Sequence, residues 1–494
     1  MELRIKKVNI SSGGPLIVII HKEDARKLDL KNLDRIKLKI GRSSVVTAVD
    51  IAKKDKIKEG YIGLFTEVFE SLNVKENENV FVEVEPKPLS LQYIKKKLDK
   101  QILSKHEIDE IIKDIISNKL TEIEMTYFVS ACYINGLTLY ESSYLTEAIL
   151  ESGSRLKLDR YPICDKHCIG GVAGNRTTPI IVSIVAAAGF TMPKTSTRSI
   201  TSVSGTADTV EVFAPVTHSK ERIEHIVKKT NACMVWGGAL ELASADDRLI
   251  KIERPLSLDP EGILLASILA KKAAVGATHV IIDIPIGKGS KIEDPGKARR
   301  LERKFKQLGK LLGMEVKVVL TNGSQPIGNG IGPALEARDV LLVLQNKGPL
   351  DLKKKSLFLA GNLLKLAGVK NGVKKAQEIL EKGLAYKKFK EIIKEQGGNP
   401  DIQPNQIKIS NVKYNVRAKN SGVVNFIDNK LLTRIAKIAG SPDDKSAGIY
   451  LNVHLRDRVK KNDVLFIIHA ENKKKMDYAL NLLDKEVISI NQKV

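Results

Sequence analysis

The chain has 494 residues, of which 43% are hydrophobic and 28% charged, a composition typical of a soluble globular protein with roughly three domains. It carries 81 Lys and Arg against 58 Asp and Glu, a formal net charge of +23. These cations are spread over helical segments that also carry acidic residues, and no basic tail, zinc finger or aromatic RNA-binding motif accompanies them. We therefore expect no nucleic-acid partner, and an RNA-binding scaffold is the alternative function from a different class.

The four cysteines indicate a reducing compartment. Cys132, Cys164, Cys168 and Cys233 form no CxxC pair and show no zinc-ligand spacing, so we expect free thiols, no metal site and a cytoplasmic protein. The N-terminal MELRIKKVNI lacks the apolar segment of a signal peptide, and no apolar run approaches the ~18 residues of a membrane helix. We expect neither a membrane span nor a membrane partner.

The first part of the chain predicts a small β-rich domain followed by a helical domain. In residues 1–84, short β-branched runs such as LIVIIH and NVFVEVEP are separated by turn signals such as SSGGP. A proline-containing linker follows. Over residues 85–156, apolar residues recur at spacings of three and four, and Ser104 and Glu107 have the spacing of a helix capping box.

The rest of the chain predicts one α/β and one α+β domain. In residues 157–408, the runs THVIIDIPIG and MEVKVVLTNG are typical of buried strands, and a charged amphipathic helix lies between them. This βαβ pattern predicts a parallel or mixed sheet. In residues 409–494, three short strands surround the helical NKLLTRIAKIAG. The predicted fold class is a multidomain protein with α/β and α+β parts.

A glycine-rich stretch, DKHCIGGVAGNR at residues 165–176, precedes the apolar helix predicted for TPIIVSIVAAAGF. A glycine loop that leads into a helix offers backbone N–H groups and the positive end of the helix dipole, and both favour an anion. Lys166 and Arg176 would add charged donors. The spacing is neither a Walker A motif nor a complete GxGxxG, so it predicts a phosphate site without a nucleotide cofactor, with a plain tight turn as the alternative.

A second stretch, TSTRSITSVSGT at residues 195–206, holds eight hydroxyl residues and one arginine. Serine and threonine are common in turns, but this density is also what a site needs to bind several phosphate or sugar oxygens. About one helix and one strand separate this stretch from the glycine stretch. Both are therefore expected at the carboxyl edge of one sheet, where open α/β sheets bind their ligands.

A third segment, RPLSLDPEGILLASILAKKAA, places Asp259 before a proline and an apolar helix. A helix cap is one interpretation of this carboxylate. Steps of four put Ser267 and Lys271 on broadly the same helix face, which can line either a core or a cleft. Lys291 follows a predicted strand and the turn IGKGSK, so it is either a further cation at a strand's carboxyl end or an ordinary surface lysine.

Taken together, these stretches resemble the thymidine phosphorylase superfamily. The resemblance rests on KHCIGGVAGNR, STRSITSVSGTADTVE, SLDPEGILLASILAKKAA and SQPIGNGIGPALEARD, which occur in the family's order from about residue 85 to 490. The extra N-terminal domain, the sequence KHCIGG and the sequence ERPLSLDP are similar to an archaeal branch that acts on nucleoside 5′-monophosphates. The resemblance implies a pentosyltransferase that converts AMP and phosphate to adenine and ribose 1,5-bisphosphate in nucleotide degradation, with CMP and UMP as further substrates.

The resemblance also implies roles for single residues. Asp259 would be the proton donor to the base, and Lys166 and Ser196 would hold the attacking phosphate. Ten residues would bind the nucleotide: Gly171, Thr197, Arg198, Ser199, Ile200, Thr201, Ser202, Thr206, Ser267 and Lys291. The family implies inorganic phosphate as a co-substrate, no cofactor, no metal, and a homodimer or larger homo-oligomer. It also implies that about residues 246–275 complete the helical domain, so that the base side and the phosphate side belong to different domains.

One departure from the family concerns the base. An arginine that clamps the pyrimidine ring in thymidine phosphorylases has no counterpart in register, since its position falls at Ile252 and Arg254 is only nearby. Strict pyrimidine specificity is therefore not expected. Two enzyme alternatives stay open: a pyrimidine-nucleoside phosphorylase, which lacks a 5′-phosphate pocket, and an anthranilate-type phosphoribosyltransferase, which requires a diphosphate leaving group and usually magnesium.

Overall fold

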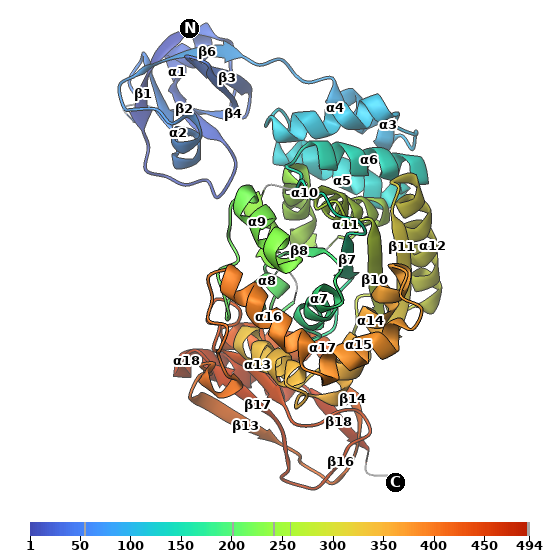
Figure 1. Cartoon of the computed structure of the whole chain (residues 1–494). Helices are drawn as coiled ribbons and strands as arrows, with labels where there is room; N and C mark the ends of the chain where they lie inside the picture. Colours follow the sequence, from blue (N-terminus) through green and yellow to red (C-terminus); the bar gives the residue numbers. More distant parts are fainter. Residues whose placement is uncertain (54–55, 200–201, 241–242, 257, 492–494) are drawn as a thin grey trace. The chain divides into compact units, whose positions relative to one another are not determined.

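The computed structural model describes residues 1–53, 56–199, 202–240, 243–256 and 258–491. The chain divides into two compact units. The first unit is Met1–Gly153 with Ala243–Ala270, and the second is Ser154–Leu242 with Lys271–Val494. Figure 1 labels the helices and strands of both units.

The first unit begins with a closed six-stranded barrel. Alternate residues of its strands point inward, so that Leu3 and Ile5 of one strand and Val80 and Val82 of another are almost wholly buried. Closure leaves no open strand edge. In the barrel order, the strands are β1 (Glu2–Lys7), β5 (Tyr61–Leu64), β2 (Ile17–His21), β4 (Ser43–Ala52), β3 (Arg35–Ile40) and β6 (Asn79–Val84), and the helices α1 (Lys22–Lys27) and α2 (Thr66–Leu72) accompany them.

A helical bundle forms the rest of the first unit. The helices α4, α5 and α6 each begin at a capping box, and the one predicted at Ser104 is confirmed. Phe128, Ile149, Leu249 and Ile263 share one hydrophobic core, so two helices from late in the chain complete the bundle. The helices are α3 (Ser90–Leu98), α4 (Lys105–Ile116), α5 (Glu122–Asn135), α6 (Leu139–Glu151), α10 (Ser244–Glu253) and α11 (Glu261–Ala274), the last of which extends into the second unit.

The α/β part of the second unit is built on parallel strands, as the βαβ pattern predicts. The strand β7 (Cys164–Cys168) pairs with β10 (His279–Ile286), and β10 pairs with β11 (Glu315–Asn322). On the other side of β7, a parallel bridge joins Ile163 to Thr191 at the start of β8 (Met192–Ser196), and β8 pairs with β9 (Ala232–Trp236). The series runs β11-β10-β7-β8-β9, so the direction of strand succession reverses between β7 and β10.

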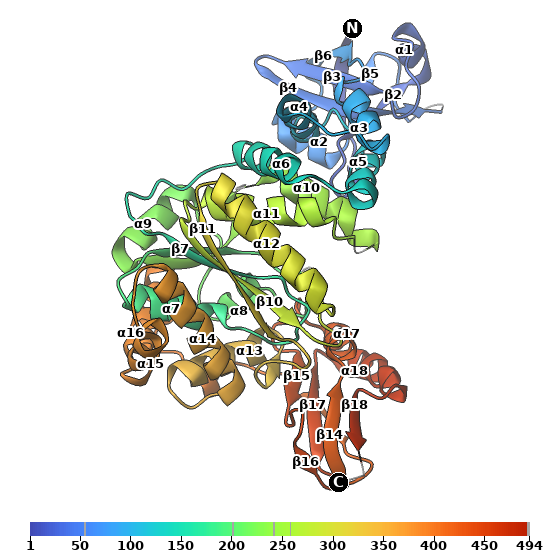
Figure 2. The ribbon, with the colours of Figure 1, turned by 90° about the vertical axis from the view of Figure 1, so that its right-hand side faces the viewer.

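Helices cover both faces of these strands. Figure 2 shows α12 (Pro295–Leu311) on one face of β10 and β11 and α14 (Leu350–Leu366) on the other. The helix α7 (Thr178–Ala187) packs against β8, β9 and α14. The helix α7 is apolar on all sides and almost fully buried, which is expected for a helix enclosed by strands and other helices. The remaining helices of this domain are α8 (Thr206–Val210), α9 (Lys220–Thr230), α13 (Pro333–Leu344), α15 (Gly372–Glu381) and α16 (Leu384–Glu395).

The C-terminal part is an antiparallel α+β domain with its own core. Val424, Ile435, Ile449 and Phe466 belong to this core and are fully buried. One sheet has the order β12 (Gly330–Ile331), β15 (Gly448–Leu451), β17 (Val464–Ala470) and β13 (Val412–Arg417), and the other has β16 (Arg458–Val459), β14 (Gly422–Ile427) and β18 (Ile488–Asn491). The helices are α17 (Asn429–Ala439) and α18 (Lys473–Leu480). Short 3₁₀ segments occur along the chain at Gly237–Leu240, Arg254–Leu256, Pro404–Gln406 and Asn481–Asp484.

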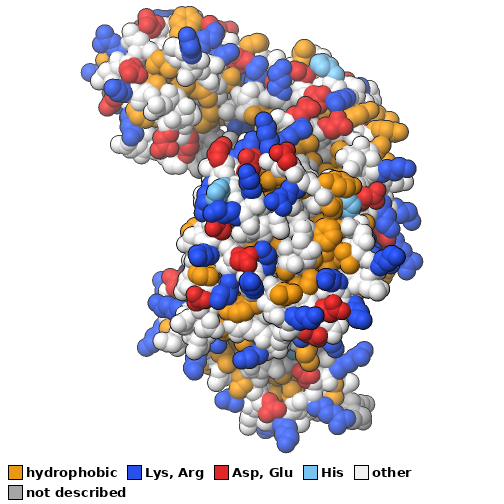
Figure 3. Space-filling view, in the orientation of Figure 1, with side chains coloured by type: hydrophobic (Ala, Val, Ile, Leu, Met, Phe, Trp, Pro, Cys, Tyr) orange, Lys and Arg blue, Asp and Glu red, His pale blue; other side chains and the backbone are white. Residues whose placement is uncertain are grey.

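One face of the surface carries its basic residues in a dispersed arrangement. On the face seen in Figure 3, Lys and Arg side chains are scattered among acidic and uncharged ones. Among the described residues, no helix is both long enough and apolar enough to cross a membrane.

Candidate active site

The glycine stretch forms the loop, residues 169–177, that leads from β7 to α7. Gly170 and Gly171 have φ angles of 95° and 84°, a region that strongly favours glycine. A Cβ atom on Gly171 would lie 2.2 Å from the backbone N of Lys291. The loops that follow β7 and β10 therefore touch, and the structure brings together two residues predicted for the site, Gly171 and Lys291, both of which are exposed.

The loop that follows β11 joins the same cluster. The Asn175 N–H donates to the Ile327 carbonyl at 2.8 Å, and the Ile327 N–H donates to the Ala173 carbonyl at 3.1 Å. A Cβ atom on Gly174 would lie 2.5 Å from that Ile327 oxygen. Three loops thus meet at the carboxyl edge of the strands, around the point where the strand order reverses. Open α/β sheets bind their ligands at such a point.

Two carboxylates hold the loop after β11. Asp339 Oδ2 accepts hydrogen bonds from the N–H groups of Asn329 and Gly330, each at 2.7 Å, and Asp351 Oδ2 accepts one from the Gly328 N–H at 2.9 Å. Asp339 is only 3% exposed, and burial raises its pKa to about 7, although the two N–H groups act in the opposite direction. The folded protein therefore binds a proton at Asp339 more tightly than an unfolded chain does.

We expect the variant Asp339→Asn to be more stable than the parent at about pH 8 and equally stable at about pH 4. Because the pKa is raised from 3.8 to about 7 on folding, the contribution of this carboxyl to the free energy of unfolding is full below about pH 4 and is lost as the pH rises to about 7. The loss is at most about 4 kcal/mol, and a neutral amide avoids it. Thermal unfolding across this pH range measures the difference. A gain that does not depend on pH, or one shared by the exposed control Asp443→Asn, would contradict the prediction.

Arg176, at the end of the glycine loop, connects it to two other segments. Its Nε donates to Glu336 Oε2 of α13 at 2.8 Å, and its two terminal nitrogens donate to Thr206 Oγ1 at 2.8 Å and to the Ser204 carbonyl at 2.7 Å. Glu336 is 2% exposed, and burial raises its pKa. Each of the three guanidinium nitrogens makes one hydrogen bond, so Arg176 ties Thr206 to the glycine loop and its charge is paired with Glu336.

The Ser/Thr stretch folds back on itself between β8 and α8. Asp208 Oδ2 accepts hydrogen bonds from the backbone N–H groups of Ser199 and Gly205, each at 2.7 Å. A Cβ atom on Gly205 would lie 2.2 Å from the Thr197 carbonyl, so only glycine allows this close approach. Among the predicted residues of this loop, the structure describes Thr197, Arg198, Ser199 and Ser202, whereas Ile200 and Thr201 lie outside the described residues.

Acidic residues neutralise Arg198. Its guanidinium makes two hydrogen bonds to Glu211, at 2.8 and 2.7 Å, and lies 5.1 Å from the ring centre of Trp236. The hydrogen bonds from Arg198, aided by Lys445, lower the pKa of Glu211 to about 2. Ser196 Oγ donates to the Val235 carbonyl at 3.2 Å. A ligand at this loop would therefore meet hydroxyl and backbone N–H groups beside an arginine whose charge is already balanced.

Three charged side chains lie beneath the glycine loop on one face of the strands. Lys166 of β7 is 2% exposed and donates from Nζ to Thr177 Oγ1, next to the start of α7, at 3.1 Å. Asp283 of β10 is fully buried, accepts from Thr321 Oγ1 at 2.6 Å, and lies 3.1 Å from Nζ of Lys355 of α14. Burial lowers the pKa of Lys166. Burial also acts to raise the pKa of Asp283, but the two lysines and Thr321 outweigh it and hold that pKa below its ordinary value.

A second buried cluster lies on the opposite face of β7. Asp165 accepts from Lys194 of β8 at 3.1 Å and from Lys272 of α11 at 2.6 Å. Burial lowers the pKa of Lys272 to about 7, although Asp165 acts in the other direction. Desolvation and nearby lysines hold the pKa of His167 well below 6.5, so this histidine is neutral near pH 7. The cluster joins β7 to β8 and α11, and Lys166 is the cation of β7 on the side of α7.

Two predicted residues belong to the first unit, whereas the other described ones belong to the second. Asp259 is exposed, and the helix α11 begins two residues later, at Glu261. The Leu264 N–H donates to the Pro260 carbonyl, so the backbone cap of α11 is Pro260 and Asp259 lies one residue before it. Ser267 lies half-buried on α11.

Three family models match the chain. The helical bundle domain of the glycosyl transferase family matches residues 91–153, the a/b domain of that family matches residues 160–386, and the pyrimidine nucleoside phosphorylase C-terminal domain matches residues 423–490. The chain is 48% identical to the AMP phosphorylase of Thermococcus kodakarensis over 98% of its own length and 96% of that relative. The chain belongs to the AMP phosphorylase family. It is therefore an enzyme, a phosphorylase among the pentosyltransferases.

More distant members of the AMP phosphorylase family match over nearly the same span. The identity is 43% with the AMP phosphorylase of Thermofilum pendens, over 94% of the chain and 91% of the relative. It is 41% with AMP phosphorylase 1 of Archaeoglobus fulgidus, over 96% of the chain and 94% of the relative. These near full-length relatives favour an AMP phosphorylase over both enzyme alternatives stated above.

The fold itself extends beyond the AMP phosphorylase family. The crystal structure of anthranilate phosphoribosyltransferase from Thermus thermophilus aligns with a TM-score of 0.53, over 62% of the chain and 99% of that protein. The sequences are only 17% identical, so this likeness concerns the fold alone.

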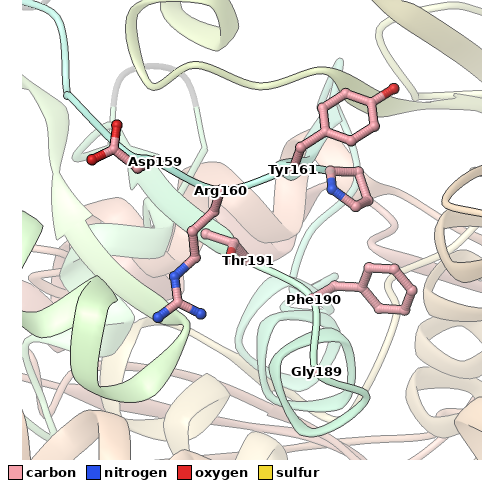
Figure 4. A pocket seen from close by; sticks show the side chains of 7 residues that line it. Asp159, Arg160, Tyr161, Gly189, Phe190 and Thr191 are labelled. Carbon is pink, nitrogen blue, oxygen red and sulfur yellow. The ribbon is translucent and has the colours of Figure 1, made fainter.

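One open pocket of the described surface lies away from these loops. It has a volume of about 560 Å³ and is lined by residues 159–162 and 189–191, which precede β7 and β8. Figure 4 shows the rings of Tyr161 and Phe190 on one side of it and the side chain of Arg160 on the other. Because it lies at the amino ends of these strands, it is at the edge opposite the glycine loop.

Sequence reasoning missed two members of the cluster beneath the glycine loop. Asp283 was identifiable as a charged residue within the apolar run VIIDIPI, since a carboxylate in a strand covered on both faces needs a partner. Lys355 gave no such signal, because it stands last in a run of three lysines of which only this one is buried.

Proposed function

We propose that this enzyme catalyses the phosphorolysis of AMP, in which AMP and inorganic phosphate give adenine and ribose 1,5-bisphosphate, and that CMP and UMP are further substrates. The similarity to AMP phosphorylases over nearly the whole chain carries this proposal. The cluster of loops at the carboxyl edge supports it, because glycine and hydroxyl residues gather there above a buried lysine.

The phosphate side of the reaction belongs to the second unit. Lys166, the N-terminus of α7 and Ser196 are the proposed contacts of the attacking phosphate, and the positive end of a helix dipole favours such an anion. The nucleotide is proposed to contact Gly171 and Lys291, which touch each other, together with the described hydroxyls of the Ser/Thr stretch and Thr206. Lysine and backbone N–H groups thereby supply the positive charge, and we propose that no metal or cofactor takes part.

The base side is proposed to belong to the first unit. Phosphate attacks C1′ of the ribose while the bond to the base breaks, and the departing base takes up a proton. Asp259 is the proposed donor of that proton, and Ser267 is a proposed further contact of the nucleotide. The exposed position of Asp259, two residues before α11, supports this role. Closure of the enzyme around its substrates would keep water from capturing the sugar.

Assembly, compartment and domain limits complete the proposal. We propose a homodimer or larger homo-oligomer in the cytoplasm. All four cysteines are free thiols, which supports a reducing compartment. The domain limits stated for residues 1–84, 85–156 with 246–275, 157–408 and 409–494 stay predictions.

The decisive experiment incubates the enzyme with AMP, CMP, UMP and the matching nucleosides in phosphate buffer and identifies the sugar product. Ribose 1,5-bisphosphate from AMP supports the proposal. Cleavage of uridine without cleavage of AMP would favour a pyrimidine-nucleoside phosphorylase. Consumption of anthranilate with a diphosphorylated ribose would favour the phosphoribosyltransferase, and salt-dependent RNA binding without any phosphorolysis would favour the scaffold.

A further inference from the structure

Lys355 is a buried cation whose ammonium group makes no hydrogen bond to the part of the chain that the structure describes. Its side chain is 7% exposed, and its Nζ lies 3.1 Å from Asp283 Oδ2 as an ion pair. Neither of these two atoms has a hydrogen-bond partner among the residues that the structure describes. A lysine is rarely buried unless its ammonium group is both paired and hydrogen-bonded, so the pair as it stands leaves donor capacity unused.

The charges around Lys355 do not balance. Lys166 and Lys355 lie on the same side of the strands, and Asp283 is the carboxylate that interacts with both. Asp283 already accepts from Thr321 through its other oxygen. Two ammonium groups and one carboxylate leave an excess of one positive charge in a site that is almost closed to water, and a bound anion would compensate it.

The position of this excess charge points to the glycine loop. Asp283 pairs in register with Cys168, the last residue of β7, and the loop begins at the next residue. Lys166 bonds to Thr177, which immediately precedes the ten residues of α7. The N-terminus of that helix, the loop and both lysines therefore lie on one side of the carboxyl edge, where N–H groups and the helix dipole favour an anion.

We propose that Lys355 is a ligand of inorganic phosphate in this enzyme, and that Asp283 positions it until phosphate binds. This proposal rests on the proposed function and adds a residue from α14 to the phosphate site. We assign phosphate as the anion because it is small, and the charged side chains of this site are at least nine-tenths buried. When phosphate binds, Nζ of Lys355 donates to a phosphate oxygen and keeps its electrostatic attraction to Asp283.

The test compares three variants with the parent enzyme. Lys355→Met removes the charge and keeps most of the length of the unbranched side chain. Asp283→Asn with Lys355→Met removes both charges of the pair, which a protein usually tolerates better than the loss of one. Lys354→Met is the matched control, because Lys354 is exposed on the same helix. For each, calorimetry gives the Kd of inorganic phosphate, and kinetics give KM for phosphate and for AMP separately.

We expect Lys355→Met and the double variant to raise the Kd and the KM of phosphate at least tenfold, and to leave the KM of AMP within about twofold. Lys354→Met should change neither. Phosphate affinity that is unchanged in Lys355→Met, or restored in the double variant, would show that Lys355 only neutralises Asp283 and would overturn the proposal. A rise in the KM of AMP alone would overturn it as well, because the lysine would then serve the 5′-phosphate.

The calorimetric measurement of phosphate binding distinguishes a failure of this ligand assignment from a failure of the proposed reaction. If the parent enzyme binds phosphate, loses that binding in the double variant and yet releases no adenine from AMP, then the reaction is wrong and the ligand assignment stands. If Lys355→Met fails to fold, the double variant decides the question. It removes the charge of Asp283 together with that of Lys355, so no buried carboxylate loses its partner.

Discussion

Replacement of Asp259 by asparagine is expected to lower kcat for AMP by about 10²- to 10⁴-fold while the KM of AMP changes little. A positioned acid accelerates a reaction by about this factor when it transfers a proton in the transition state. The amide of asparagine occupies the same space and can form a hydrogen bond, but it has no acidic proton to give. Steady-state kinetics with AMP at saturating phosphate measure both constants, and the pH dependence of kcat should lose the ionisation of the acid.

The matched control for this variant is Glu261→Gln. Glu261 begins α11, so its substitution changes the charge of the same chain segment without removing the proposed donor. We expect this control to keep kcat within about threefold, because it leaves the proposed proton donor in place. An Asp259→Asn enzyme with full turnover would refute the role as proton donor. It would indicate that Asp259 only bonds to a base that is already protonated.

Replacement of Arg176 by methionine is expected to destabilise the second unit by about 3–5 kcal/mol, the usual result when one partner of a buried ion pair is removed. Glu336 would keep a carboxylate that is 2% exposed and has lost its cation, and the Ser204 carbonyl and Thr206 would lose their donors. Burial already raises the pKa of Glu336. The loss of stability should therefore be smaller at about pH 5, where the carboxyl takes up a proton more readily.

Denaturant unfolding at two pH values measures this effect. The double variant Arg176→Met with Glu336→Gln should recover part of the lost stability, because no buried charge is then unpaired. Arg299→Met, at an exposed position of α12, should change stability by less than about 0.5 kcal/mol. A single variant at Arg176 that is as stable as the parent would show that the link between the glycine loop and α13 contributes little.

Much of the fold was predictable because its signals are local. The capping box at Ser104 needs only Glu107 three residues on, and the inward residues of the barrel follow the alternation of each strand. The closeness of Gly171 and Lys291 was also predictable. A glycine loop follows β7 and a lysine follows β10, and loops after neighbouring parallel strands meet at the same edge of a sheet. Such features depend on a few neighbouring residues and on the geometry of the strand.

The pairing of charges was not predictable from the same sequence. Arg176 lies in the glycine-rich stretch and Arg198 in the Ser/Thr stretch, which were both predicted to bind anions. In the structure, Arg176 forms an ion pair with Glu336, and Arg198 forms one with Glu211. Lys355 resembles its two neighbouring lysines, and only the packing of α14 on β10 distinguishes it. By itself the sequence indicated the kind of protein and its multidomain fold class, and it predicted the stretches that would carry the chemistry. The tertiary structure decided which cations are free for a ligand, because the partner of a buried charge comes from any part of the chain that folding brings within about 3 Å.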